Sequence, residues 1–260
     1  MNSDQPVAYE VKDQVAYIYM NSAPVNAIDH TMLDALHQAL RGADKDPAAH
    51  AVVLTSGLEG MFCGGMDLRM AASSDAQSLR EFVYKFYIET MDIQYAYTKP
   101  TVAMLNGPAR GAGMTLSITC DMIVAADDVD LGYPEIDVGL IPAIHYAHLP
   151  KQIGRHKAFE LLFGGKPIPS TQAAAMGLIN YAVPAQELHR FTRELARGLA
   201  EKSPTIMALG RASFMRANDL DYRRNVENQI ETLCNVFATA DGREGLQAFL
   251  EKRPPRWQSL

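Results

Sequence analysis

The chain has 260 residues, 48% of them hydrophobic and 21% charged, which are ordinary proportions for a globular protein. Its 24 lysines and arginines against 30 acidic residues give a net charge of -6. We therefore expect no nucleic-acid partner, because such partners usually require a basic excess. Three cysteines without metal-ligand spacing predict free thiols and no metal site. The absence of a signal-like N-terminus and of an 18-residue apolar run predicts a cytoplasmic protein with no membrane partner.

Short apolar runs alternate with helical patterns through the first half of the chain. The expected strands are residues 15–20, 51–57, 101–107 and 122–127. The apolar spacing predicts helices at residues 31–46, 75–97 and 115–121. This alternation predicts an α/β fold with parallel strands and right-handed crossovers, and with helices on both faces of the sheet.

The second half, from about residue 144, has helical patterns throughout. Helices are expected at residues 157–165, 170–177 and 185–203, and the first two end at glycines. Residues 203–253 form three further helical stretches, separated at residues 218–219 and 241–242. This amphipathic tail is expected to pack against the core or against another subunit.

Two loops rich in small residues follow apolar strands and precede helices. They read EGMFCGGMDLRM (residues 59–70) and NGPARGAG (residues 106–113). Glycine lets other groups approach the backbone closely, and helix N-termini have unpaired N–H groups. Two such loops at neighbouring strand ends predict an oxyanion hole, in which two backbone N–H groups surround one oxygen. Tight packing of helix on strand, with nothing bound, is the alternative.

Six motifs in this order carry a resemblance to a known family: PVNAID, MFCGGMDL, NGPARGAG, CDMIVAAD, GYPEIDVGLIP and FLEKRPPRW. From about residue 8 to its end, the chain resembles the enoyl-CoA hydratase/isomerase (crotonase) superfamily. The resemblance implies an α/β spiral of repeated ββα units over residues 1–195, with the acyl-CoA site. It also implies a C-terminal helical region, residues 196–260, in a homotrimer or homohexamer. No separate cofactor is expected, because the substrate carries the coenzyme A.

The resemblance also implies roles for particular residues. The oxyanion-hole N–H donors fall on Met66 and Ala112, and both act through the backbone. The segments at the CoA entrance correspond to Asn26, Ala27, Ile28, Cys63, Asp67 and Leu68. Turn and packing roles are the alternative for these six. The variable helical region that shapes the acyl tunnel contains Met70, Phe82, Phe86 and Tyr87.

The catalytic carboxylates depart from the family pattern. Hydratases of the family use two glutamates; the second falls on Glu135, but the first falls on Thr115. Threonine has no useful acidity and can only form hydrogen bonds. A single glutamate can still remove a proton beside a thioester and return it elsewhere, which is double-bond isomerisation. A paired structural carboxylate is the alternative for Glu135.

A second departure follows GLIP, where the chain reads AIHYAHLPKQIG and is one residue shorter than the family pattern. His145 and Tyr146 replace glycines of the family there, and His148 follows. Histidine beside a carbonyl site is a candidate general base, and His145 is the better candidate of the two; a structural role is the alternative. Tyr133 is a candidate hydrogen-bond donor or a rim aromatic.

These residues favour an acyl-CoA enzyme that holds a thioester enolate and isomerises an enoyl-CoA with Glu135. Three alternatives stay open: an enoyl-CoA hydratase of reduced activity, C–C or thioester cleavage (retro-Claisen, decarboxylase or hydrolase) with a histidine base, and a non-catalytic CoA-thioester binding subunit.

Overall fold

A computed structural model describes residues 5–218 and 221–257 of the chain. Its centre is a six-stranded sheet in the order β1-β2-β3-β4-β6-β9. These strands are β1 (Val7–Lys12), β2 (Val15–Met20), β3 (Ala51–Ser56), β4 (Thr101–Leu105), β6 (Met122–Ala126) and β9 (Tyr181–Val183). The four predicted strands, β2, β3, β4 and β6, pair in parallel as expected, and β9 continues the parallel sheet.

The sequence prediction missed β1, which pairs antiparallel with β2. Asp13 and Gln14, which join the two strands, both have positive φ, as in the two-residue turns that suit a hairpin. Only Val7 of β1 is fully buried. An edge strand of this kind lacks the continuous apolar run that marked the other strands.

A second, three-stranded sheet contains β5 (Ala109–Arg110), β7 (Asp130–Gly132) and β8 (Ile168–Pro169). Two isolated parallel bridges, Ile28 to Met66 and Cys63 to Ala109, extend its pattern. Each successive turn of the spiral therefore contributes a long strand, a short pairing segment and a helix. This arrangement is the predicted spiral of ββα units.

The expected helices are present, with shifted ends. They include α1 (His30–Lys45), α7 (Arg155–Gly164), α8 (Ser170–Ala175) and α9 (Leu188–Ala200), and the short 3-10 turn η3 (Ala185–Glu187) precedes α9. Residues predicted as one helix, 75–97, form α3 (Ala76–Tyr84), the π-helical segment η1 (Lys85–Glu89) and α4 (Thr90–Ala96). The helix predicted from residue 115 begins earlier, as α5 (Ala112–Thr119).

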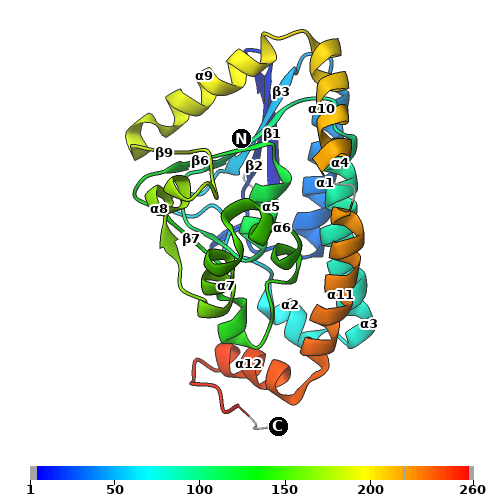
Figure 1. The fold of residues 1–260 in the computed structure, drawn as a ribbon, viewed down its shortest axis with the longest axis vertical. Helices are drawn as coiled ribbons and strands as arrows, with labels where there is room; N and C mark the ends of the chain where they lie inside the picture. The colour runs from blue at the N-terminus through cyan, green and yellow to red at the C-terminus, as the bar shows by residue number, and fades with distance from the viewer. Residues whose placement is uncertain (1–4, 219–220, 258–260) are drawn as a thin grey trace.

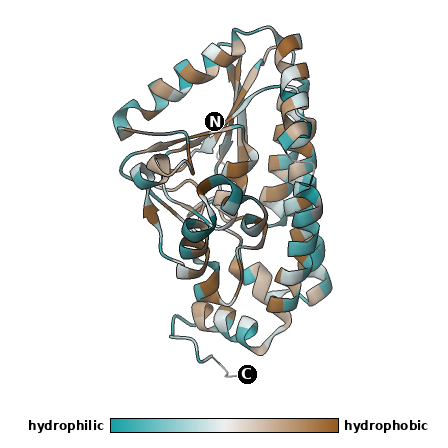
Figure 2. Ribbon diagram, in the orientation of Figure 1, coloured by the Kyte–Doolittle hydropathy of each residue, from teal (hydrophilic) through white to brown (hydrophobic). Residues whose placement is uncertain are grey.

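Helices cover the sheet, as Figure 1 shows. Helix α1 contacts β1 and β2, and α9 contacts β2, β3, β4 and β6. In Figure 2 the strands are mostly hydrophobic, while the outer helices alternate hydrophobic and hydrophilic residues. The buried core is accordingly continuous from the sheet to the inner faces of the helices.

Three helices follow α9: α10 (Pro204–Asn218), α11 (Tyr222–Ala238) and α12 (Ala240–Leu250). The break predicted at residues 241–242 lies earlier, at Thr239, which caps α12, and Gly242 lies inside that helix. The other break was placed correctly at Asn218, the end of α10, although Asp219 lies outside the described residues. No helix in the described parts of the chain is long and apolar enough to span a membrane.

The C-terminal helices pack on the chain's own core. Helix α11 contacts α3 and α6 (Ala143–Ile153), and α12 contacts α2 (Leu68–Ser73) and the 3-10 turn η2 (Pro134–Val138). A Cβ added to Gly245 of α12 would lie 2.5 Å from the backbone carbon of Val138, so α12 and η2 are in backbone contact. The predicted boundary at residues 195/196 falls inside α9, and that division of the chain stays a prediction.

Candidate active site

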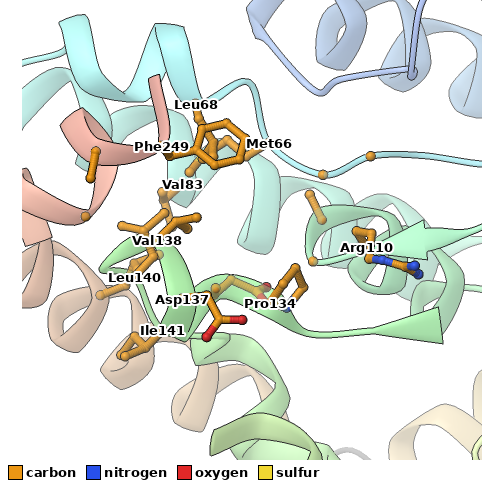
Figure 3. A pocket seen from close by; sticks show the side chains of 18 of the residues that line it. Met66, Leu68, Val83, Arg110, Pro134, Asp137, Val138, Leu140, Ile141 and Phe249 are labelled. Atoms are coloured by element: carbon orange, nitrogen blue, oxygen red, sulfur yellow. The ribbon is translucent and has the colours of Figure 1, made fainter. Parts of the chain in front are cut away.

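A cavity of about 440 Å³ lies between the spiral core and α12. Its walls are mostly apolar (Figure 3): Met66, Leu68, Val83 and Phe249 gather at one end, and the guanidinium of Arg110 points outward at the other. The glycine loops, η2, η1, α11 and the C-terminal segment all contribute lining residues. An apolar cavity with few polar groups is a typical small-molecule site.

The two glycine loops bring two free backbone N–H groups to this cavity. Ile28 N–H donates to Gly65 O at 2.8 Å and Asp67 N–H donates to Ile28 O at 3.0 Å. The intervening N–H of Met66 therefore points away from that bridge. Ala112 is the first residue of α5, where an N–H has no partner within the helix. Among the described residues, neither N–H donates a hydrogen bond.

The loops touch at two glycines with positive φ. A Cβ on Gly65 (φ +112°) would lie 3.3 Å from Arg110 O and 3.9 Å from Ala112 N. A Cβ on Gly111 (φ +48°) would lie 2.9 Å from Oε1 of Glu135. These glycines let the loops and the carboxylate converge. The structure thus brings Met66, Ala112 and Glu135 together at one cavity, and their catalytic roles stay predictions.

Other glycines of the same loops serve tight packing. A Cβ on Gly113 would lie 2.7 Å from Cys63 O, and one on Gly107 would lie 2.3 Å from Met61 N. Some glycines of the two loops therefore serve close packing, and others leave the backbone open to the cavity. The oxyanion hole stays a prediction.

The carboxyl group of Glu135 is the one acidic group buried in the cavity wall among the described residues. It extends from η2, which ends at Gly139 in the left-handed conformation (φ +75°). Its Oε2 is buried and has no hydrogen-bond partner among the residues described. Burial raises the pKa of Glu135 to about 7. A carboxylate with this pKa is suited to proton transfer near neutral pH.

Thr115 is buried and does not line the cavity. Its Oγ1 lies 3.2 Å from Nε2 of His145, and Nδ1 of His145 lies 2.9 Å from Nε2 of His148. Burial lowers the pKa of His145 well below its ordinary value and that of His148 to about 4. Both rings are therefore neutral at neutral pH. His145 packs edge-on against Tyr133, with ring centroids 4.4 Å apart.

Three of the residues expected to contact coenzyme A form hydrogen bonds within the protein. The amide of Asn26 donates to Ser56 Oγ and Phe62 O. The thiol of Cys63 donates to Asn26 O, and burial raises its pKa to about 12. Asp67 caps α2 by accepting from the N–H groups of Arg69 and Met70.

Among the six residues expected at the CoA entrance, only Leu68 lines the cavity. Ile28, which forms the isolated bridge with Met66, is buried, and the preceding Ala27 is half-buried. The predicted contacts of all six with coenzyme A stay predictions.

The rest of the cavity wall contains residues that the sequence analysis named and others that it missed. Phe86 and Tyr87 line the cavity from the π-helical segment, while Met70 and Phe82 do not. The missed lining residues are Val83, Arg110, Pro134, Asp137, Val138, Leu140, Ile141, Leu233, Gly245, Ala248, Phe249, Arg253 and Pro255. Asp137 and Arg253 belong to the motifs GYPEIDVGLIP and FLEKRPPRW, and membership in a motif was the one signal that pointed to them.

Residues 10–259 match the Enoyl-CoA hydratase/isomerase family. The chain belongs to this family. A Bos taurus protein, enoyl-CoA hydratase domain-containing protein 2, mitochondrial, is 32% identical over 252 residues, covering 94% of this chain and 84% of that protein. Hydroxycinnamoyl-CoA hydratase-lyase of Pseudomonas fluorescens is 30% identical over 259 residues, covering 95% and 92%.

Solved structures share the fold. An enoyl-CoA hydratase from Bacillus anthracis superposes with a TM-score of 0.77 and 29% identity, covering 97% of this chain and 99% of that one. Family membership and the crotonase fold are thus established, and the family is one of hydratase- and isomerase-type enzymes acting on acyl-CoA.

Proposed function

We propose that the protein isomerises a 3-enoyl-CoA to the 2-enoyl-CoA. The observation that carries this proposal is a single buried carboxylate, Glu135, with a pKa of about 7, beside the free N–H groups of Met66 and Ala112. The thioester oxygen accepts from the two N–H groups, Glu135 removes a proton from C2, and the enolate forms. Glu135 then returns the proton to C4.

Each group has a physical reason for its part. Oxyanion-hole donors are most effective in water-poor sites, where one is typically worth about 2.7–4 kcal/mol. The apolar walls formed by Leu68, Val83 and Phe249 provide such a site. Hydration is less favoured, because Thr115 replaces the second water-holding carboxylate and is hydrogen-bonded to His145.

Cleavage with a histidine base receives less support. His145 is fully buried, and neither His145 nor His148 lines the cavity. Their lowered pKa values also make both weak bases.

We further propose that the protein is a homotrimer or homohexamer. We also propose that it uses no separate cofactor, because the substrate carries the coenzyme A. The exposed hydrophobic side chains of Ile206, Leu209 and Phe214 on α10 support an oligomer, since contiguous apolar surface often marks a subunit contact. Cytoplasmic location stays a prediction, because the Bos taurus relative is named mitochondrial.

The test is Glu135→Gln, assayed on a panel of 3-enoyl-CoA and 2-enoyl-CoA thioesters. Positioned acid–base groups contribute on the order of 10²–10⁴-fold, so isomerisation should fall by about that factor. Calorimetry should show nearly unchanged binding of acyl-CoA, because the substitution is isosteric. Wild-type activity limited to hydration, or a variant as active as the wild type, would overturn the proposal.

A further inference from the structure

Three polar side chains, two of them buried, form a continuous hydrogen-bonded line behind the cavity wall. They come from α5 and α6: Thr115 Oγ1 lies 3.2 Å from His145 Nε2, and His145 Nδ1 lies 2.9 Å from His148 Nε2. Thr115 and His145 are 2% and 0% exposed. Nothing in the proposed reaction uses the two imidazoles.

The outer end of this line reaches a second cavity. His148 is half-buried and lines a cavity of about 430 Å³ that shares no lining residue with the first. Its other lining residues include polar side chains: Asp121, Gln152, Asn180 and Tyr222. A polar cavity of this size has room and hydrogen-bonding partners for water.

The inner end of the line reaches Gly111, which Glu135 also approaches. Thr115 Oγ1 is 3.5 Å from Gly111 O, and Oε1 of Glu135 is 2.9 Å from where a Cβ on Gly111 would lie. The hydroxyl and the carboxylate thus approach the same glycine. Glu135 Oε2 and Tyr133 Oη are both buried without a partner in the described chain. Buried oxygens usually bind water when no protein group is in reach. A water between Thr115 and Glu135 is therefore part of the inferred path.

We propose that Thr115, His145 and His148 carry protons between Glu135 and water in the second cavity. The inference rests on the proposed function, in which Glu135 holds the proton taken from the substrate. It makes the second cavity a proton port, separate from the opening through which the thioester enters.

The transfer balances at every atom. The water beside protonated Glu135 takes its proton and passes one to Thr115 Oγ1, while the Thr115 hydroxyl proton goes to His145 Nε2. The Nδ1 proton of His145 goes to His148 Nε2, and the Nδ1 proton of His148 goes to water in the second cavity. Glu135 is left as a carboxylate, and both imidazoles remain neutral with their protons on Nε2. Passage of a solvent proton inward reverses each step and restores both tautomers.

Neutral imidazoles suit this relay. Each can accept a proton at one nitrogen as it releases one from the other. Because burial keeps both pKa values low, neither ring retains the proton as a stable cation. A merely structural hydrogen-bond chain would fix Thr115 and His145 but would not connect the substrate's proton to solvent.

The isotopic fate of the proton distinguishes the two roles. A 3-enoyl-CoA is isomerised in D₂O, and mass spectrometry and NMR measure deuterium at C4 of the product per turnover. Without the relay, Glu135 returns mainly the original proton. With it, the wild type incorporates solvent deuterium in most turnovers.

The first variant is His148→Gln, which keeps a hydrogen-bonding group beside His145 but cannot pass a proton on. Deuterium per turnover should fall by about tenfold or more, since a positioned proton-transfer group contributes on the order of 10²–10⁴-fold. The matched control is Ile118→Val in the wall of the second cavity, which should change neither deuterium incorporation nor turnover. Thr115→Val breaks the line of three side chains at its inner end, so it should lower deuterium incorporation as well. It tests the relay if His148→Gln does not fold.

Turnover with unchanged deuterium incorporation in both His148→Gln and Thr115→Val would overturn the relay and leave the isomerase proposal standing. Low deuterium incorporation by the wild type would do the same. Failure of the wild type to turn over any 3-enoyl-CoA would instead overturn the proposed function, and the relay with it.

Discussion

The two sides of the reaction cavity differ in the interactions that position their functional groups. On one side, the N–H groups of Met66 and Ala112 are placed by backbone pairing of the glycine loops with each other and with Ile28. On the other side, Glu135 extends from a short 3-10 turn, and its Oε2 has no partner among the described residues. The donor side depends on backbone conformation and tolerates many side chains. The acid–base side depends on one side chain and on its burial.

Gly111 connects the two sides, so we expect its substitution to have the largest effect. Gly111→Ala places a Cβ 2.9 Å from Glu135 Oε1 at a residue with φ +48°, which displaces both the carboxylate and the start of α5. Turnover should fall by at least about 10²–10³-fold, the cost of losing one oxyanion-hole donor. Steady-state kinetics with a 3-enoyl-CoA measures the loss.

The matched control is Gly154→Ala, which has a similar positive φ (+85°) but no atom within 4 Å of the added Cβ. It should reduce stability without a comparable loss of kcat. Equal losses of kcat in the two variants would mean that general backbone strain, rather than contact with Glu135, causes the effect.

The pH dependence of stability tests the burial of Glu135. Its carboxyl pKa is raised from 4.5 to about 7 in the folded protein, so the folded state retains a proton that the unfolded state releases. The resulting stabilisation is fully present below pH 4.5 and is lost as the pH rises through about 7. At about 1.4 kcal/mol per pKa unit, the loss is about 3.5 kcal/mol.

Urea unfolding of the wild type and of Glu135→Gln between pH 4.5 and 8 measures this loss. The difference in unfolding free energy between the two proteins should change by that amount, and the subtraction removes the contributions of His145 and His148. A difference that does not vary with pH would show that Glu135 is solvated or paired in solution.

The contact between α12 and η2 helps to fix the position of Glu135, because Glu135 belongs to η2. Gly245→Ala would place a Cβ 2.5 Å from the Val138 backbone, and overpacking typically costs about 1–3 kcal/mol. We expect that loss of stability in thermal unfolding, together with a shift in the pH profile of turnover as Glu135 moves. Gly198→Ala, on α9 with no atom within 4 Å, is the control and should be neutral or slightly stabilising.

Local sequence patterns predicted the parallel sheet and the two glycine loops, whereas the spiral of ββα units and the positions of Met66 and Ala112 came from the resemblance to the family. Apolar runs marked β2, β3, β4 and β6, and glycines marked the loops that carry Met66 and Ala112. The sequence prediction missed β1, which has only one fully buried residue. It also named Thr115 and His145 as separate candidates. Their contact depends on how α6 packs against α5, which neither helix's own pattern specifies.

The smallest expected effect is at Met66, and it sharpens the contrast between the two sides. If Met66 acts only through its N–H, Met66→Leu conserves the donor and nearly conserves the volume, a change that usually costs less than about 1.5 kcal/mol. We expect kcat to stay within about threefold of wild type, below the 10²–10³-fold loss of a missing donor. Because the side chain lines the apolar cavity, KM for the acyl-CoA should change more than kcat. A large fall in kcat with unchanged KM and unchanged thermal stability would show that the Met66 side chain itself takes part in the chemistry. The donor side would then depend on its side chains as much as the Glu135 side does.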